Sequence, residues 1–182
     1  METQIKAYYH SQDGIKLVSI FGYASKGVPG LEVHGAGKLS RNIKEKMIFL
    51  TRQRQLKIPL RRFVICLDQT EASQLDEVAT QSLEFPFLLV YWFLAGLIPI
   101  KKLENCVASG WVNTEGEIRL PHMNDQSERE ILKAFTANRR NQILTIGREG
   151  ASINAAMLLG HIPELKFKDD SRQGQIIRLL NG

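Results

Sequence analysis

Basic side chains are concentrated in one part of this sequence, and such side chains bind phosphate groups. Between Lys38 and Arg62 the only acidic residue is Glu45. The cations of this stretch are Lys38, Arg41, Lys44, Lys46, Arg52, Arg54, Lys57, Arg61 and Arg62. Because each cation that contacts a phosphate releases a counterion, the cluster predicts a salt-sensitive, backbone-directed DNA-binding surface. The alternative is a solvated helix face that keeps the protein in solution, and composition does not separate the two.

The other side chains with potential chemistry do not form a known site. The four histidines lie far apart, without a cysteine or carboxylate at ligand spacing: His10, His34, His122 and His161. Metal sites need several such ligands at short spacings, so no metal site is predicted. The glycine-containing turns lack the Lys-Ser/Thr pair that completes a phosphate-binding loop, and no cofactor is expected.

Length and composition predict one domain over residues 1-182. Of the 182 residues, 43% are hydrophobic and 24% are charged, which is enough to bury a substantial core. The net charge of +5 and the pI near 9.3 favour acidic partners such as nucleic acid. Many proteins with a similar charge bind no nucleic acid, so the charge alone does not identify the partner.

Three features of the sequence bear on location. Cys66 and Cys106 both lie in apolar surroundings, which predicts buried, reduced thiols in an intracellular protein. The first ten residues lack the basic region and apolar run of a signal peptide. The apolar run Phe85–Ile100 has 16 residues, whereas a bilayer span needs about 20, so it predicts a buried helix. We therefore expect a cytoplasmic protein without membrane contact.

The elements that must position the basic residues begin with strands. Ile5–His10 and Lys16–Ala24 flank a turn at Gly14 and predict an antiparallel hairpin. The turn Gly27–Gly30 then leads to a strand over Leu31–His34, which predicts a second hairpin.

The basic residues themselves fall on a predicted helix and strand. Ser40 is the expected N-cap of an amphipathic helix whose apolar side contains Ile43, Met47 and Leu50, with a mostly basic outer side. After Pro59, the segment Arg61–Leu67 ends in an apolar run typical of a central strand.

The second half of the chain predicts alternating strands and helices. Residues 68–81 are polar and predict a loop. Strands are expected at Asn105–Asn113, Glu117–Leu120, Gln142–Ile146 and Glu164–Phe167, and helices at Ser127–Asn138, Ala151–Leu159 and Ser171–Leu180. The fold class is α+β, with a mixed sheet packed against helices. The aromatic residues expected in the core are Tyr8, Tyr9, Tyr23, Trp92 and Trp111.

Four segments carry a resemblance to a known family. Gly22–Asp68, Ser82–Pro99 and Gly110–Pro121 are similar, in order, to the amino-terminal domain of the magnesium-chelatase-like, ComM-type proteins, and the ending from Gln142 to Gly182 is similar too. The resemblance implies a Lon-protease-like fold, also described as the ribosomal protein S five domain 2-like fold. It also implies a bacterial protein that works with competence or recombination machinery. The ATPase domain of that family is not in this sequence.

In active Lon-type proteases a serine at the start of the apolar helix is activated by a lysine at the start of the next helix. The resemblance places Gln81 at the serine position, with Ser82 one residue later as an expected helix N-cap. Around the expected lysine the chain reads Asn124–Glu130, where Arg129 does not lose its proton at ordinary pH, and Lys133 lies about one turn too late. No catalytic residue is therefore predicted, and the domain is expected to be a pseudo-protease.

Three hypotheses remain from the sequence. The first is a non-catalytic Lon-like scaffold or DNA-binding module that acts with recombination proteins. The second is an oligomerisation or docking module that forms a homo-oligomer or binds a separate AAA+ ATPase. The third is a serine peptidase with a rearranged dyad of Ser82 and Lys133 or another lysine.

Overall fold

A five-stranded mixed sheet forms one layer of the protein. The computed structural model describes residues 1–12, 14–68, 75–98, 102–104, 106–119, 121 and 126, together with the backbone of 143–145, 152–154 and 176–178. The strands are β1 (Glu2–Ser11), β2 (Gly14–Ser25), β3 (Gly30–His34), β4 (Arg62–Leu67) and β5 (Val107–Ala108), in the spatial order β3-β4-β2-β1-β5. β2 is antiparallel to β1 and β4, whereas the pairs β3–β4 and β1–β5 are parallel.

The first predicted hairpin is confirmed, and the second is wrong. β1 and β2 pair with Ile5 opposite Ile20, and Gly14 adopts a φ of 109° at the turn. β2 and β3 do not pair, because β4 lies between them. Parallel strands need a crossover, and here it runs through the 3-10 helix η1 (Gly37–Leu39) and α1 (Ser40–Gln53). The predicted interior position of the strand that ends at Leu67 is confirmed.

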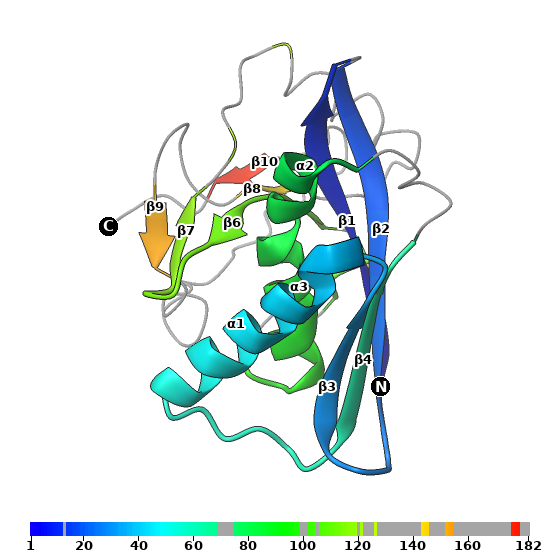
Figure 1. The fold of residues 1–182 in the computed structure, drawn as a ribbon, viewed down its shortest axis with the longest axis vertical. Helices are drawn as coiled ribbons and strands as arrows, with labels where there is room; N and C mark the ends of the chain where they lie inside the picture. The colour runs from blue at the N-terminus through cyan, green and yellow to red at the C-terminus, as the bar shows by residue number, and fades with distance from the viewer. Residues whose placement is uncertain are drawn as a thin grey trace.

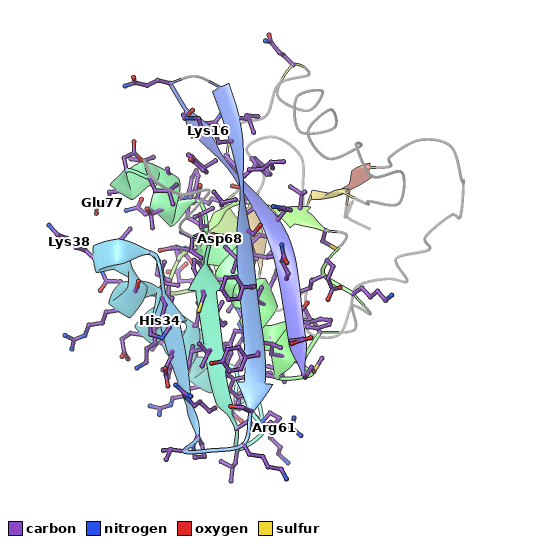
Figure 2. The ribbon with its side chains drawn as sticks, turned by 90° about the vertical axis from the view of Figure 1, so that its right-hand side faces the viewer. Lys16, His34, Lys38, Arg61, Asp68 and Glu77 are labelled. Atoms are coloured by element: carbon purple, nitrogen blue, oxygen red, sulfur yellow. The ribbon has the colours of Figure 1, made fainter. Side chains whose placement is uncertain are left out.

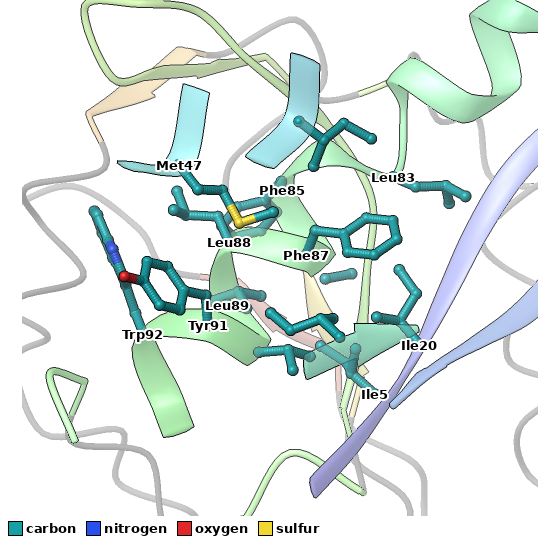
Figure 3. Close-up of a cluster of buried hydrophobic side chains, with 14 of the residues drawn as sticks. Ile5, Ile20, Met47, Leu83, Phe85, Phe87, Leu88, Leu89, Tyr91 and Trp92 are labelled. Carbon is teal, nitrogen blue, oxygen red and sulfur yellow. The ribbon is translucent and has the colours of Figure 1, made fainter. Parts of the chain in front are cut away.

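Three helices lie on one side of the sheet: α1, α2 (Glu77–Gln81) and α3 (Glu84–Leu94) (Figure 1). Every residue of α3 is buried, as its apolar sequence predicts, but the helix ends at Leu94, before the end of the predicted run Phe85–Ile100. Its side chains meet those of β1 and β2 in the core, where Ile5 and Ile20 lie near Phe87 (Figure 3). Gly22 permits this close approach, since a Cβ there would lie 3.0 Å from Val90 Cγ1. Within the ranges given above, no helix is long and apolar enough to cross a membrane.

The buried carboxylate of Glu84 joins three elements. Its Oε1 lies 2.6 Å from Lys46 Nζ on α1, and its Oε2 accepts a hydrogen bond of 2.9 Å from the backbone N–H of Val112. A second buried link runs from α3 to α1, where Trp92 Nε1 donates to Thr51 Oγ1 over 3.1 Å. These bonds fix α1 beside α3, so they determine which side of α1 faces outward.

Short strands form two further small sheets. β6 (Trp111–Val112), β7 (Glu117–Arg119) and β9 (Ser152–Asn154) form one, and β8 (Ile143–Thr145) and β10 (Ile176–Arg178) form the other. The predicted hairpin turn at residues 114–116 and the predicted strand at β8 are confirmed. The predicted strand over 105–113 is interrupted, because its two ends join different sheets as β5 and β6.

Two predicted helices are wrong where the backbone is described. Residues 152–154 and 176–178 are strands, because β9 pairs with β7 and β10 pairs with β8. Tertiary pairing thus prevails over the apolar spacing that favoured helices. The predicted helix over 127–138 and the predicted strand over 164–167 lie outside the described residues.

Both predicted serine caps are wrong. Leu39 is the N-cap of α1 and Leu83 that of α3, while Ser82 ends α2. The predicted loop over 68–81 is wrong at its end, where α2 forms because Asp76 Oδ1 accepts a 2.7 Å bond from the N–H of Ala79.

The predicted core is correct for most of its aromatic residues and cysteines. Tyr8, Tyr9 and Trp92 are buried, but Tyr23 and Trp111 are 39% and 38% exposed. Cys106 is buried, and burial raises the pKa of its thiol to about 12. Cys66 is only half-buried, because it lies on the face of the sheet away from the helices.

Replacing the Glu84 carboxylate tests the link among α1, α3 and β6. Glu84→Ala leaves Lys46 and the N–H of Val112 without their acceptor, which should lower the free energy of unfolding by about 3 kcal/mol. Urea unfolding followed by circular dichroism measures this change. Glu45→Ala removes an exposed carboxylate from α1 and should alter the same quantity by less than about 0.5 kcal/mol. Equal effects of the two variants would contradict the proposed link.

Candidate nucleic-acid interface

Three of the nine predicted phosphate-binding residues form bonds with other groups of the protein. Lys46 is paired with Glu84, and its side chain is 25% exposed. Arg54 donates from Nη2 to the carbonyl of Glu115 over 3.2 Å, so it holds the β6–β7 turn against the end of α1. Gly116 makes room for this contact, since a Cβ at that position would meet the Arg54 guanidinium.

The third internally bonded cation is Arg62. Its Nε and Nη2 donate to the two carboxylate oxygens of Glu32 over 2.7 Å and 3.0 Å, and His34 Nε2 lies 3.4 Å from Glu32 Oε2. The Arg62 guanidinium lowers the pKa of Glu32 to about 2. This group joins β3 to the start of β4 on the face of the sheet away from the helices.

The other six cations have no ion-pair partner among the residues that the structure describes. They are Lys38, Arg41, Lys44, Arg52, Lys57 and Arg61. All are exposed except Lys44, which is half-buried. They follow one path, from η1 along α1 and through the connection to β4; Figure 2 shows Lys38 and Arg61 at its two ends. We call these six residues the basic track.

Helical geometry explains why α1 presents its part of the basic track outward. Ile43, Met47 and Leu50 recur at helical spacing and are buried against the core. Arg41 and Arg52 lie about opposite to this apolar side, separated by about 16 Å along the helix axis at 1.5 Å per residue. Glu45 lies between them and is the one acidic side chain of α1. The track can therefore contact several phosphates along one backbone.

A pocket of about 510 Å³ lies beside the first residues of the basic track, between η1 and α2. It combines Lys38 with the carboxylates of Asp76 and Glu77 and with Asn42. Lys38 of the basic track lines the pocket, but the two carboxylates repel phosphate, so the pocket itself is not a phosphate-binding site of the track.

The serine expected near the Lon-type nucleophile position is engaged in a local bond. Ser82 is 7% exposed, and its Oγ donates to the carbonyl of Ala79 over 2.6 Å. Gln81 beside it is exposed. Arg129 and Lys133 lie outside the described residues. Within the described part of the chain, no three His, Cys, Asp or Glu side chains are grouped so that they could hold a metal ion.

The structure adds residues that sequence patterns did not identify as part of a surface. Val28 and Leu60 are 85% and 86% exposed. Each lies in a loop within two residues of a basic residue, Lys26 for Val28 and Arg61 for Leu60. In the sequence, each of these exposed residues is an aliphatic residue next to a proline in a loop. This pattern is also common in ordinary turns, so it does not by itself predict a binding surface.

The fold and this surface define an α+β protein in which a basic helix packs beside a mixed sheet. No family model matches the sequence, and no curated protein is significantly similar to it.

Removing the guanidinium of Arg62 tests whether this side chain is bonded to Glu32 and so joins β4 to β3. Arg62→Met should raise the pKa of Glu32 from about 2 toward 4.5, because the hydrogen bonds that stabilise the carboxylate are lost. The pair stabilises the folded state at neutral pH, and this contribution disappears as the pH falls from 4.5 toward 2. Carboxyl-detected NMR titration measures the pKa. Arg61→Met removes a neighbouring arginine and should leave the Glu32 value near 2; an equal rise would refute the assignment.

Proposed function

We propose that this chain is a non-catalytic, Lon-like module that binds DNA through the basic track and acts with recombination or competence proteins. The observation that carries the proposal is the set of six cations, five exposed and one half-buried, that have no ion-pair partner in the described structure. Lysines that only solubilise a helix are usually interspersed with acids, whereas this track has Glu45 alone. The motifs shared with ComM-type proteins support the same partner.

The chemistry of the track favours contact with the DNA backbone. Lysine and arginine bind phosphate oxygens of any sequence, and these contacts determine position and affinity rather than base preference. If all six cations contact phosphates of duplex DNA, the logarithm of the binding constant falls with the logarithm of salt with a slope of about −5. Steering by the net charge of +5 would speed the encounter at low salt.

The local bond of Ser82 supports a non-catalytic role. A serine nucleophile needs a base within hydrogen-bond reach and an accessible hydroxyl, whereas this hydroxyl is buried and donates to a backbone carbonyl. No observation on the described residues favours the serine peptidase over a binding module.

Neutralising two residues of the basic track tests the proposal. Arg41→Gln/Lys44→Gln should weaken duplex DNA binding about 10-fold or more at 50 mM salt and reduce the salt slope by about 2. Fluorescence anisotropy with a labelled duplex at several salt concentrations measures both quantities.

A matched control removes two positive charges elsewhere. Lys16 lies at the opposite end of the sheet from Arg61 (Figure 2), and Lys102 precedes β5. Lys16→Gln/Lys102→Gln should retain the salt slope of the unaltered protein. Absence of DNA binding at low salt, or equal losses in both double variants, would exclude the basic track as the binding surface.

A second candidate function, a docking or oligomerisation module, is favoured by the face of the sheet away from the helices. Phe21 and Tyr23 lie two residues apart on β2, on this face, and are 41% and 39% exposed. Val64 of β4 lies opposite Tyr23 but is buried, so the exposed apolar area of this face comes from Phe21 and Tyr23. Adjacent exposed aromatics are typical of the centre of a protein interface.

Molar mass in solution distinguishes the second candidate from a monomeric DNA binder. If this face joins two copies, light scattering should give about twice the 20.6 kDa chain mass, and Phe21→Ser/Tyr23→Ser should return it to one chain. Trp111→Ser removes an aromatic residue of similar exposure from another sheet and should leave the dimer intact. A monomer at all concentrations would eliminate the self-association form of this candidate.

A further inference from the structure

Two fully exposed aliphatic side chains lie on neighbouring loops at one end of the sheet. Val28 is on the loop between β2 and β3, and Leu60 is on the segment that enters β4; their exposures are 85% and 86%. A hydrogen bond of 3.1 Å from the N–H of Gly30 to the carbonyl of Arg61 joins the two loops. Figure 1 shows the β2–β3 loop and the start of β4 at the same end of the molecule. We call Val28 and Leu60 the apolar tip.

The loops that carry the apolar tip are anchored close to it. Arg62 of β4 pairs with Ser25 of β2 on one side and with Gly30 of β3 on the other, so both loops begin or end at the same level of the sheet. Pro29 and Pro59 restrict the backbone next to the tip residues. The N–H of Arg61 also donates to the carbonyl of Pro59 over 2.8 Å. The apolar side chains are thus presented on an ordered support.

Positive charges surround the apolar tip. Lys26 and Arg61 are exposed and lie within two residues of Val28 and Leu60, and Lys57 is exposed farther along the same connection. Neither residues 25–31 nor residues 53–62 contain an acidic residue. The partner of this end of the protein should therefore offer negative charge together with an apolar interior.

The basic track ends at this tip. Arg61 is both the last cation of the track and the neighbour of Leu60. A cationic path that extends along α1 and then reaches the tip fits a linear polyanion, whereas a flat lipid surface would be met by the tip alone. Duplex DNA has an apolar base stack beneath its phosphates, and proteins enter it with aliphatic wedges at the minor groove.

We propose that Val28 and Leu60 form a wedge that inserts between base pairs of duplex DNA when the basic track holds the backbone. This inference rests on the proposed function, and it specifies the form of the ligand and the way it is deformed. Partial unstacking is least costly at flexible pyrimidine–purine steps, so the wedge should prefer DNA that contains TA steps. Removing the wedge removes no charge, so the salt slope should not change.

The experiment uses the full chain and a duplex with 2-aminopurine beside a central TA step, because unstacking of this base raises its fluorescence. The unaltered protein should raise the fluorescence on binding. Val28→Ser/Leu60→Ser should abolish the rise and weaken binding about 10-fold, with the salt slope retained. Val78→Ser, an exposed valine on α2 with 74% exposure, should behave as the unaltered protein. Because both tip residues are exposed, their replacement should not disturb the core. Unchanged unfolding temperatures would verify that each variant folds.

The outcomes separate this inference from the proposed function. DNA binding that depends on the basic track, without a fluorescence rise or an effect of Val28→Ser/Leu60→Ser, overturns the wedge and leaves the proposed function standing. No binding to the duplex at low salt overturns both. Association with phosphatidylserine vesicles that depends on Val28 and Leu60, without a fluorescence response from DNA, overturns the wedge in favour of a membrane-binding tip.

Discussion

The buried carboxylate of Glu84 is the contact on which the arrangement of the helices depends. It accepts bonds from Lys46 on α1 and from the N–H of Val112 on β6, while its own backbone begins α3. Next to it, the N–H of Phe85 donates to the carbonyl of Gly110 over 2.9 Å. An ion pair in this position costs desolvation, so its main effect is to specify one arrangement of the three elements.

That arrangement divides the cations of one short stretch into two groups. Lys46, Arg54 and Arg62 bond to groups of the protein, and each joins segments that are distant in the sequence. The basic track lies on η1, on the side of α1 that faces away from the core, and on the connection to β4. Because a polyanion can approach only the outward group, the density of positive charge in the sequence overstates the number of possible phosphate contacts.

The protein offers two surfaces with different physical properties. One is the basic track with the apolar tip at its end, where charge attracts a ligand over a distance and the exposed aliphatic groups act only at contact. The other is the face with Phe21 and Tyr23, where Arg62 is already neutralised by Glu32 and aromatic area dominates. The first has the properties of the proposed nucleic-acid interface, and the second has those of the proposed docking surface.

Local patterns in the sequence determined the β1–β2 hairpin, the buried helix and the amphipathic character of α1, because alternation, length and helical spacing act between near neighbours. They did not determine that β4 separates β2 from β3, or that residues 152–154 and 176–178 are strands, because these depend on pairing between distant segments. The same holds for the candidate site. The sequence identified all nine cations, but only the tertiary structure assigned Lys46, Arg54 and Arg62 to internal bonds. It also brought the loops that carry Val28 and Leu60 to the same end of the sheet. A side chain's availability depends on what the fold places next to it.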